Sequence, residues 1–211
     1  MSQVKVVEIF KSIEGEGKWI GLPVSFVRLE GCNLRCEWCD TPYSYDGKSF
    51  TLLDVDELVE RISEFRLKRV CITGGEPFLT EELPLIVKKL LEKGHTVLIE
   101  TNGTLWNSRI KELLSGNLLI TCSPKPPYYF IHPELLPHIT ELKYVVDETL
   151  SLGHIINEKT EKILKNDFIV LQPEGNRKEM VEKALYLQEE ILKAGYESRV
   201  IPQCHKVLGL P

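Results

Sequence analysis

Apolar and polar positions alternate along this chain with two different periods, and segments of the two kinds take turns. The run PVSFVRLEG (23–31) alternates as a strand does, and RVCITGG (69–75) is typical of a short buried strand. A longer run, TLLDVDELVERISEF (51–65), places apolar residues at helical spacing, with Asp54 as a plausible N-cap. The sequence therefore predicts strands and helices in alternation.

The same pattern continues to the end of the chain. Further strands are expected at 95–103, 117–125, 141–147, 167–173 and 198–204. Further helices are expected at 81–94, where Gly94 ends the helix, at 108–116, in part of 151–165 and at 177–195. The proline-rich stretch 124–137 is expected to be a loop.

The order of these elements indicates the fold class. Strands that alternate with helices imply an α/β fold, a parallel sheet with helical crossovers. Six or seven such strands are fewer than a full βα barrel needs, so an open doubly wound sheet and an incomplete barrel both fit. Repeats, low-complexity stretches and linkers are absent from the sequence, which predicts a single domain over residues 1–211.

Residues that are suited to catalysis or ligand binding follow the predicted strands. GCNLRC, TGGEP, ETNGT, SPK and QPEG each come directly after a strand pattern or at its end. In parallel α/β folds the carboxyl ends of the strands carry the chemistry. We therefore expect the candidate site residues to gather at one rim of the sheet.

Composition limits the possible partners. Of the 211 residues, 43% are hydrophobic and 27% are charged, which is ordinary for a globular protein. A net charge of −5 argues against a general nucleic-acid or membrane-surface binder. No apolar run approaches a membrane span, and the N-terminal stretch lacks the apolar region of a signal peptide. The expected location is the cytoplasm, where thiols stay reduced and six cysteines are not a disulfide framework.

Three cysteines are closely spaced, as Cys32-x3-Cys36-x2-Cys39. A structural zinc site normally takes four ligands, and a redox CxxC would leave Cys32 unexplained. Cys71 and Cys122 lie within strand patterns, where a buried small residue is the usual interpretation. An iron–sulfur cluster explains the count better, because three thiolates leave one iron open to another ligand.

This loop resembles that of the radical S-adenosylmethionine (SAM) superfamily. Trp38 before the last cysteine, TGGEP (73–77) after the next strand and SPK (123–125) after a later one extend the resemblance. It implies a [4Fe–4S] cluster whose open iron binds SAM, and a partial βα barrel of the radical SAM type.

Over essentially the whole chain, the sequence resembles the 7-carboxy-7-deazaguanine synthase family. The resemblance rests on EGEG, FVRLEGCN, CEWCDT, TGGEP, ETNGT, SPK, ELKYVV, LQPEG and QCHKVLGLP. It implies conversion of 6-carboxy-5,6,7,8-tetrahydropterin to 7-carboxy-7-deazaguanine with release of ammonia, a step of queuosine and deazapurine biosynthesis. Mg²⁺ assists, and SAM is used catalytically.

The resemblance also implies roles for individual residues. Cys32, Cys36 and Cys39 hold the cluster, and Thr41 is the Mg²⁺ ligand. The residues implied in SAM binding are Trp38, Cys39, Asp40, Gly74, Gly75, Glu76, Ser123, Pro124, Lys125, Gln172, Pro173 and Glu174. Glu100 and Asn102 of ETNGT are weaker candidates.

The substrate residues come from both ends of the chain. They are Ile13, Glu14, Gly15, Glu16, Arg28, Thr73, His205 and Pro211, the last through its terminal carboxylate. An Arg fork suits the pterin 6-carboxylate, and a carboxylate suits its guanidine-like edge. The family often has Gln where this chain has Glu14, which removes an amide donor and adds a negative charge.

Two other functions remain open on the sequence alone. One is a glycyl-radical-enzyme activase of the same superfamily, and the other is a non-catalytic metal-binding module. The family further suggests a homodimer and an electron donor such as a flavodoxin, and neither nucleic acid nor a membrane is expected as a partner.

Overall fold

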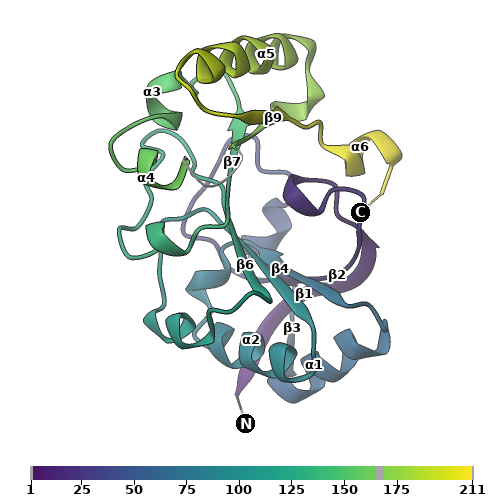
Figure 1. Ribbon diagram of the computed structural model, residues 1–211. Helices are drawn as coiled ribbons and strands as arrows, with labels where there is room; N and C mark the ends of the chain where they lie inside the picture. The colour runs from purple at the N-terminus through teal and green to yellow at the C-terminus, as the bar shows by residue number, and fades with distance from the viewer. Residues whose placement is uncertain (1, 165–168, 211) are drawn as a thin grey trace. The chain divides into compact units, whose positions relative to one another are not determined.

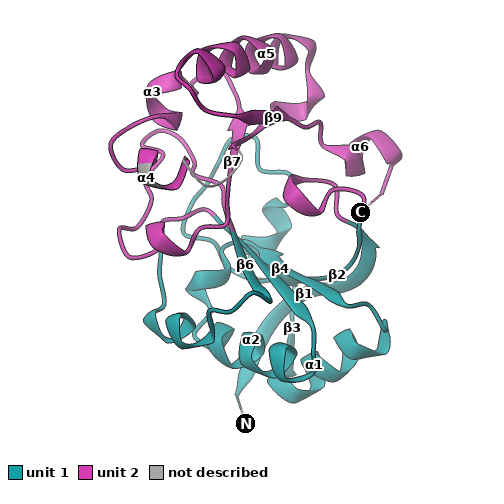
Figure 2. Ribbon diagram, viewed as in Figure 1, with its two compact units in different colours: residues 1–13, 22–101, 105–120 teal, residues 14–21, 102–104, 121–211 magenta. Residues whose placement is uncertain are grey.

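The computed structural model describes residues 2–164 and 169–210, and the chain forms two compact units. Unit 1 comprises Met1–Ile13, Leu22–Thr101 and Leu105–Ile120. Unit 2 comprises Glu14–Gly21, Asn102–Thr104 and Thr121–Pro211 (Figure 2). A short N-terminal segment, Glu14–Gly21, thus belongs to the unit that is otherwise built mainly from the C-terminal part of the chain.

Unit 1 is built on five strands in the order β3-β1-β2-β4-β5. β1 pairs antiparallel with β2 and β3, and β4 pairs parallel with β2 and β5. Helices α1 and α2 pack on each other beside these strands (Figure 1). The bounds are β1 (Gln3–Ile13), β2 (Pro23–Leu29), β3 (Thr51–Asp54), α1 (Val55–Glu64), β4 (Arg69–Gly74), α2 (Leu83–Glu92) and β5 (Thr96–Thr101), with 3-10 helices η2 (Pro42–Tyr45), η3 (Pro77–Leu79) and η4 (Ser108–Leu113).

Local sequence explains the helix ends in unit 1. Asp54 is the N-cap of α1, and its side chain accepts a hydrogen bond of 2.9 Å from the Asp56 amide. The helix buries Val55, Leu58, Val59 and Ile62, which recur at helical spacing. The predicted cap and the predicted apolar stripe of this helix are both confirmed.

Unit 2 contains four parallel strands in the order β6-β7-β8-β9. The longest helix, α5, packs against β7, β8 and β9. No helix within the described ranges is long and apolar enough to cross a membrane. The bounds are η1 (Gly17–Trp19), β6 (Leu118–Cys122, beginning in unit 1), η5 (Leu136–His138), β7 (Glu141–Val146), α3 (Leu152–Ile155), α4 (Glu161–Leu164), β8 (Ile169–Pro173), η6 (Glu174–Asn176), α5 (Lys178–Lys193), β9 (Ser198–Val200) and α6 (Cys204–Leu208).

The predicted α/β class, with a mostly parallel sheet and helical crossovers, is confirmed. Among the described strands, β3 has one neighbour in unit 1 and β9 has one in unit 2, so the strands do not close into a full barrel. Cys71 and Cys122 are fully buried in strands, as expected. A single domain over 1–211 stays a prediction.

Several element predictions were wrong at their edges. β1 and β3 were not predicted; the helix begins after its predicted N-cap Asp54, and residues 51–54 before it form β3. Residues 108–113 form a 3-10 helix, and the strand predicted over 198–204 ends at Val200. The predicted strand 167–173 and helix 151–165 each extend into residues 165–168, which lie outside the described residues.

Candidate functional site

The three closely spaced cysteines lie on the loop that follows β2. All three are reduced cysteines and partly exposed. Backbone hydrogen bonds shape the loop, from the Gly31 amide to the Ser44 carbonyl at 2.7 Å and from the Cys39 amide to the Cys36 carbonyl at 3.2 Å. The Leu34 amide donates to Cys32 Sγ at 3.4 Å, a bond that would favour a thiolate there.

The donor set fits an iron–sulfur cluster. Such a cluster takes one thiolate on each of several irons, so its ligands need not meet at one point. Among the described residues, no three His, Cys, Asp or Glu side chains converge as ligands of a single metal ion. Burial raises the pKa of Cys32, and ligation to iron is what would hold such a thiol deprotonated.

The TGGE segment (73–76), which begins in the last two residues of β4, packs against this loop. The Gly75 amide donates to the Leu29 carbonyl at 3.1 Å, and the Glu76 amide donates to the Gly31 carbonyl at 2.7 Å. A Cβ on Gly75 would overlap the Gly31 carbonyl and lie 2.9 Å from Cys32 Cβ. Gly75 is therefore required by the chain's own packing against the cysteine loop.

Glu76 is fully buried and bound within unit 1. Its Oε1 accepts hydrogen bonds from the Phe78 amide at 3.0 Å and from Thr101 Oγ1 at 2.7 Å. Thr73 lies near the end of β4 and is half-buried. The structure thus places the predicted residues Thr73 to Glu76 directly beside the loop of Cys32.

Arg28 is oriented by two residues that the sequence interpretation missed. It lies opposite Glu8 in the pairing of β1 with β2, and its Nε donates to Glu8 Oε1 at 2.6 Å. The Tyr43 hydroxyl donates to the same oxygen at 3.0 Å. Burial alone would lower the pKa of Arg28, but the bond to Glu8 raises that pKa above its ordinary value.

Thr41 and Asp40 provide oxygen atoms next to the cluster loop. Thr41 Oγ1 lies 3.9 Å from Cys39 Sγ, and the Thr41 carbonyl accepts from the Ser44 amide at 2.9 Å. Thr41 is half-buried and Asp40 is exposed. Oxygen donors of this kind suit Mg²⁺.

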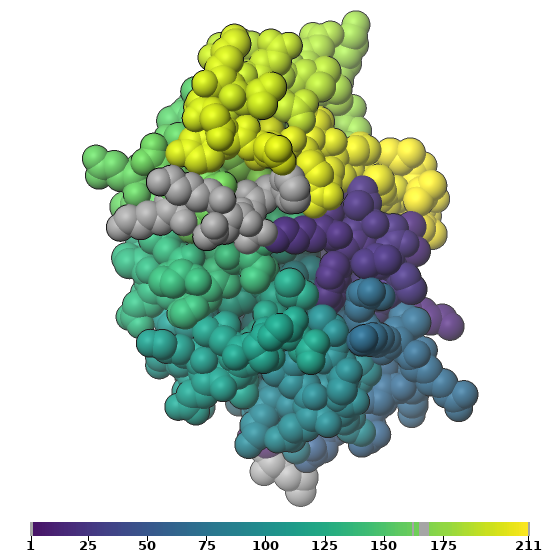
Figure 3. Space-filling view, in the orientation of Figure 1, coloured from purple at the N-terminus to yellow at the C-terminus, as the bar shows by residue number. Residues whose placement is uncertain are grey.

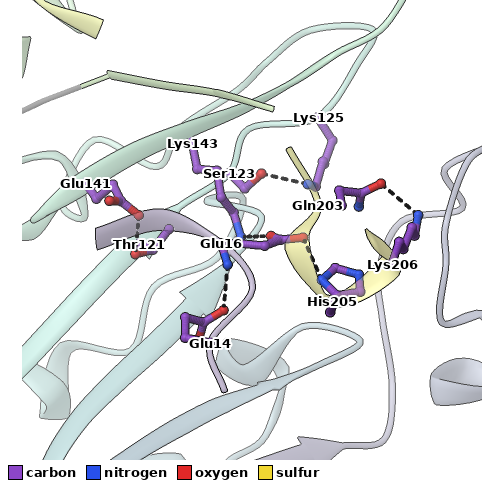
Figure 4. A network of polar contacts seen from close by, with 10 residues as sticks. All are labelled: Glu14, Glu16, Thr121, Ser123, Lys125, Glu141, Lys143, Gln203, His205 and Lys206. Atoms are coloured by element: carbon purple, nitrogen blue, oxygen red, sulfur yellow. Dashed lines mark hydrogen bonds and ion pairs between the residues drawn. The ribbon is translucent and has the colours of Figure 1, made fainter. Parts of the chain in front are cut away.

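In unit 2, the predicted substrate segment contacts the end of the chain (Figure 4). Glu16 forms an ion pair with Lys143 of β7, and its Oε1 lies 3.9 Å from His205 Nδ1. The Cys204 amide donates to the Gly15 carbonyl at 3.2 Å. In the space-filling view, residues 14–21 have the purple of the start of the colour bar and residues 204–210 the yellow of its end (Figure 3).

The remaining predicted residues of unit 2 follow β6 and β8. Lys125 Nζ donates to Ser123 Oγ at 2.7 Å, and Pro124 between them is buried. Gln172 and Pro173 are buried at the end of β8. Glu174 follows β8 and forms an ion pair with Arg177, with 2.6 Å between Glu174 Oε2 and Arg177 Nε. All six residues of unit 2 that were predicted to bind SAM thus have described positions: Ser123, Pro124, Lys125, Gln172, Pro173 and Glu174.

The weaker candidates have local roles. Asn102 Oδ1 accepts from the Thr104 amide at 2.9 Å and from its hydroxyl at 2.6 Å, which is the turn role that Asn-Gly suggests. Glu100 is half-buried in β5. Pro211 lies outside the described residues.

Sequence reasoning missed Glu8, Tyr43, Glu141 and Lys143. Glu8 lies in a strand that was not predicted, and Tyr43 follows the cysteine motif without any periodic signal. Lys143 is 5% exposed and Glu141 is 1% exposed, both on β7. The sequence did contain a signal for Glu141 and Lys143, because they are two charged residues at alternate positions of an otherwise apolar strand.

Comparison with known proteins gives the family. The Radical SAM superfamily matches residues 26–187. A 7-carboxy-7-deazaguanine synthase from Aquifex aeolicus is 48% identical, over 96% of this chain and 92% of that protein. Another, from Thermoplasma acidophilum, is 36% identical over 96% of each chain.

Solved structures share the fold. The crystal structure of QueE from Escherichia coli has a TM-score of 0.72 at 24% identity, covering 94% of this chain and 93% of that one. Streptococcus suis SuiB bound to S-adenosylmethionine has a TM-score of 0.58 at 15% identity, covering 81% of this chain and 44% of that one. The open sheet, the cysteine loop and these relatives together show that this chain belongs to the radical SAM superfamily and, within it, to the 7-carboxy-7-deazaguanine synthase family.

Proposed function

We propose that this chain converts 6-carboxy-5,6,7,8-tetrahydropterin to 7-carboxy-7-deazaguanine and releases ammonia. The observation that carries the proposal is the loop of three reduced, partly exposed cysteines, which the TGGE segment contacts through backbone hydrogen bonds. It occurs in a chain 48% identical to the Aquifex aeolicus 7-carboxy-7-deazaguanine synthase over nearly the full length of both.

Cys32, Cys36 and Cys39 would hold a [4Fe–4S] cluster with one open iron. When bound and reduced, the cluster supplies the electron that cleaves SAM and provides the hydrogen-abstracting radical. The residues that would bind SAM are Trp38, Cys39, Asp40, Gly74, Gly75, Glu76, Ser123, Pro124, Lys125, Gln172, Pro173 and Glu174.

Arg28 would bind the substrate carboxylate. Its Nε is bound to Glu8, and this leaves the two terminal nitrogens as the pair of donors that matches a carboxylate. Because its side chain is 14% exposed, the charge is largely shielded from water and the interaction is stronger than on an open surface.

The other substrate contacts would come from Ile13, Glu14, Gly15 and Thr73, with the tail contributing His205 and Pro211. Glu16 is bound to Lys143, so its carboxylate has a partner within the protein before any pterin arrives. We assign its first role to the conformation of the segment and not to the pterin edge.

Thr41 would provide a hydroxyl ligand for Mg²⁺, with the substrate carboxylate and waters completing the shell. The protein would act in the cytoplasm as a homodimer, with a flavodoxin or a similar protein as electron donor. The net charge of −5 is consistent with a small-molecule substrate and not with a nucleic acid.

The test is an anaerobic incubation of the cluster-loaded protein with SAM, Mg²⁺, a reductant and the carboxytetrahydropterin. The product should be identified by mass spectrometry against authentic 7-carboxy-7-deazaguanine. A parallel reaction with tetrahydropterin that lacks the 6-carboxylate should give no product, because the terminal nitrogens of Arg28 would have no substrate carboxylate to bind. Cleavage of SAM without any deazaguanine would favour the activase alternative, and a protein that never cleaves SAM would favour the metal-binding module.

A further inference from the structure

Lys143 is a buried cation to which the proposed function assigns no contact with SAM or the pterin. It lies in the middle of β7, is 5% exposed, and is flanked by Leu142 and Tyr144, which are also buried. Burying an ammonium group is costly unless an anion accompanies it. A lysine at such a position therefore needs a partner, and the partner identifies its role.

That partner is Glu16, which is 127 residues away in the sequence. Lys143 Nζ donates to Glu16 Oε2, and the side chain of Glu16 is 16% exposed (Figure 4). Burial of Glu16 would raise its pKa, but the charge and hydrogen bond of Lys143, with a smaller contribution from His205, lower that pKa to about 2. The pair is therefore fully charged at neutral pH.

The segment that carries Glu16 has little regular structure of its own. Within Glu14–Gly21 the described elements comprise only the three-residue η1, and the Gly21 amide closes the segment by donating to the Glu14 carbonyl at 2.8 Å. The Glu16 amide donates to Glu14 Oε1 at 3.2 Å. Such a segment depends on the rest of unit 2 for a single conformation.

Unit 2 contacts the segment on both sides of Glu16. A Cβ on Gly15 would lie 2.7 Å from His205 Nδ1, and a Cβ on Gly17 would overlap the Glu141 carboxylate. Lys18 Nζ donates to the Thr140 carbonyl. The charged groups around Glu16 and its neighbours include Lys143 and Glu141 of β7, His205 of α6, and Glu14 and Lys18 of the segment itself.

We propose that Lys143 is a positioning residue, whose ion pair with Glu16 fixes the Glu14–Gly21 segment in the conformation that presents its backbone to the pterin. The inference rests on the proposed function for the identity of the ligand, but the anchoring of the segment by Lys143 does not. Neither Lys143 nor Glu16 is among the residues proposed to bind SAM, and so the loss of Lys143 should affect pterin binding and not SAM binding.

The test compares Lys143→Met with wild type and with Lys183→Met. Lys183 is a matched control in unit 2, because its Nζ donates to the carbonyls of Asp147 and Glu148 and to no carboxylate. We expect KM for the carboxypterin to rise about tenfold or more in Lys143→Met, with the dissociation constant of SAM unchanged. Lys143→Arg keeps the charge and should recover part of the loss, and Lys183→Met should match wild type.

A second readout does not depend on turnover. Hydrogen–deuterium exchange of the amides in 14–21 should be faster in Lys143→Met than in wild type, while exchange in β2 and β4 stays the same. If Lys143→Met does not fold, Glu16→Gln provides the same comparison, because it removes the charge of the other partner in the ion pair.

The possible outcomes distinguish failure of the proposed function from failure of the positioning role of Lys143. Faster exchange in 14–21 without any deazaguanine from wild type would support the anchor and overturn the proposed function. Unchanged exchange together with an unchanged KM in Lys143→Met would overturn the positioning role, whatever the reaction. A raised KM for the pterin accompanied by an equal loss of SAM affinity would also overturn it, because it would indicate general damage to the unit.

Discussion

At the scale of single residues, the site is organised by charged groups that are already paired within the protein. Arg28 is held by Glu8 and Glu16 is held by Lys143, each across a short contact between a cation and a carboxylate. Arg28, Lys143 and Glu16 are largely buried, whereas Glu8 is 36% exposed, so the three buried side chains lose little further freedom when a ligand binds. Preorganisation of this kind favours affinity and geometry over adaptability.

The orientation of Arg28 gives the first prediction. In Glu8→Gln the bond to Arg28 Nε loses its charge, and the guanidinium is less firmly held. We expect KM for the carboxypterin to rise about tenfold, corresponding to about 1.4 kcal/mol, with kcat changed by less than about threefold. Glu57→Gln is the control, because Glu57 forms an exposed ion pair of the same length, 2.6 Å, with Arg61. Equal effects of the two substitutions would remove Glu8 from the account.

The low pKa of Glu16 gives a prediction about stability. A carboxyl whose pKa falls from 4.5 to about 2 on folding contributes stability that is complete above its unfolded value. That contribution is lost as the pH falls from about 5 through about 2. We therefore expect the difference in free energy of unfolding between wild type and Glu16→Gln to be largest near pH 7 and to narrow towards pH 3.

Urea unfolding at several pH values measures that difference. Glu182→Gln serves as control, because Glu182 is 66% exposed and should give a small difference at every pH. A gap between wild type and Glu16→Gln that stays constant down to pH 3 would contradict the assignment of a low pKa to Glu16.

At the scale of elements, the loops after β2 and β4 are packed together and joined by backbone hydrogen bonds. Gly75 lies so close to Gly31 that no side chain fits between them, and the backbone bonds at Leu29 and Gly31 join the two loops. In Gly75→Ala the backbone must move, so we expect lower thermal stability and substantially less iron per chain after reconstitution. Gly116→Ala is the control, because the space around that position is open. Wild-type iron content in Gly75→Ala would show that this close packing is unnecessary.

Periodicity predicted well the elements in which buried positions are apolar and exposed positions are polar. α1, with Asp54 as its cap, and the buried strands β4 and β8 are examples. β1 was missed because only Val4 and Val6 alternate cleanly as buried residues, and the later positions are half-buried and mixed in character. A strand with two partners and one partly exposed face carries a weak sequence signal.

At the scale of the whole molecule, the sequence motifs predicted the chemistry but not the division of the chain into units. The cysteine spacing and TGGEP are local signals, and they identified the cluster loop and its neighbour correctly as adjacent segments. The Glu14–Gly21 segment belongs to unit 2 although β1 and β2 on either side of it belong to unit 1. Its link to Lys143 depends on a contact between distant residues, which no periodic pattern contains.

The most direct measurement of the central claim is the ratio of ammonia to deazaguanine formed per chain over many turnovers. With wild-type protein, the carboxytetrahydropterin, Mg²⁺, a reductant and a limited amount of SAM, we expect the two products in a ratio of one to one and in excess over the SAM consumed. Consumption of SAM in proportion to turnover, or without ammonia and 7-carboxy-7-deazaguanine, would contradict the account.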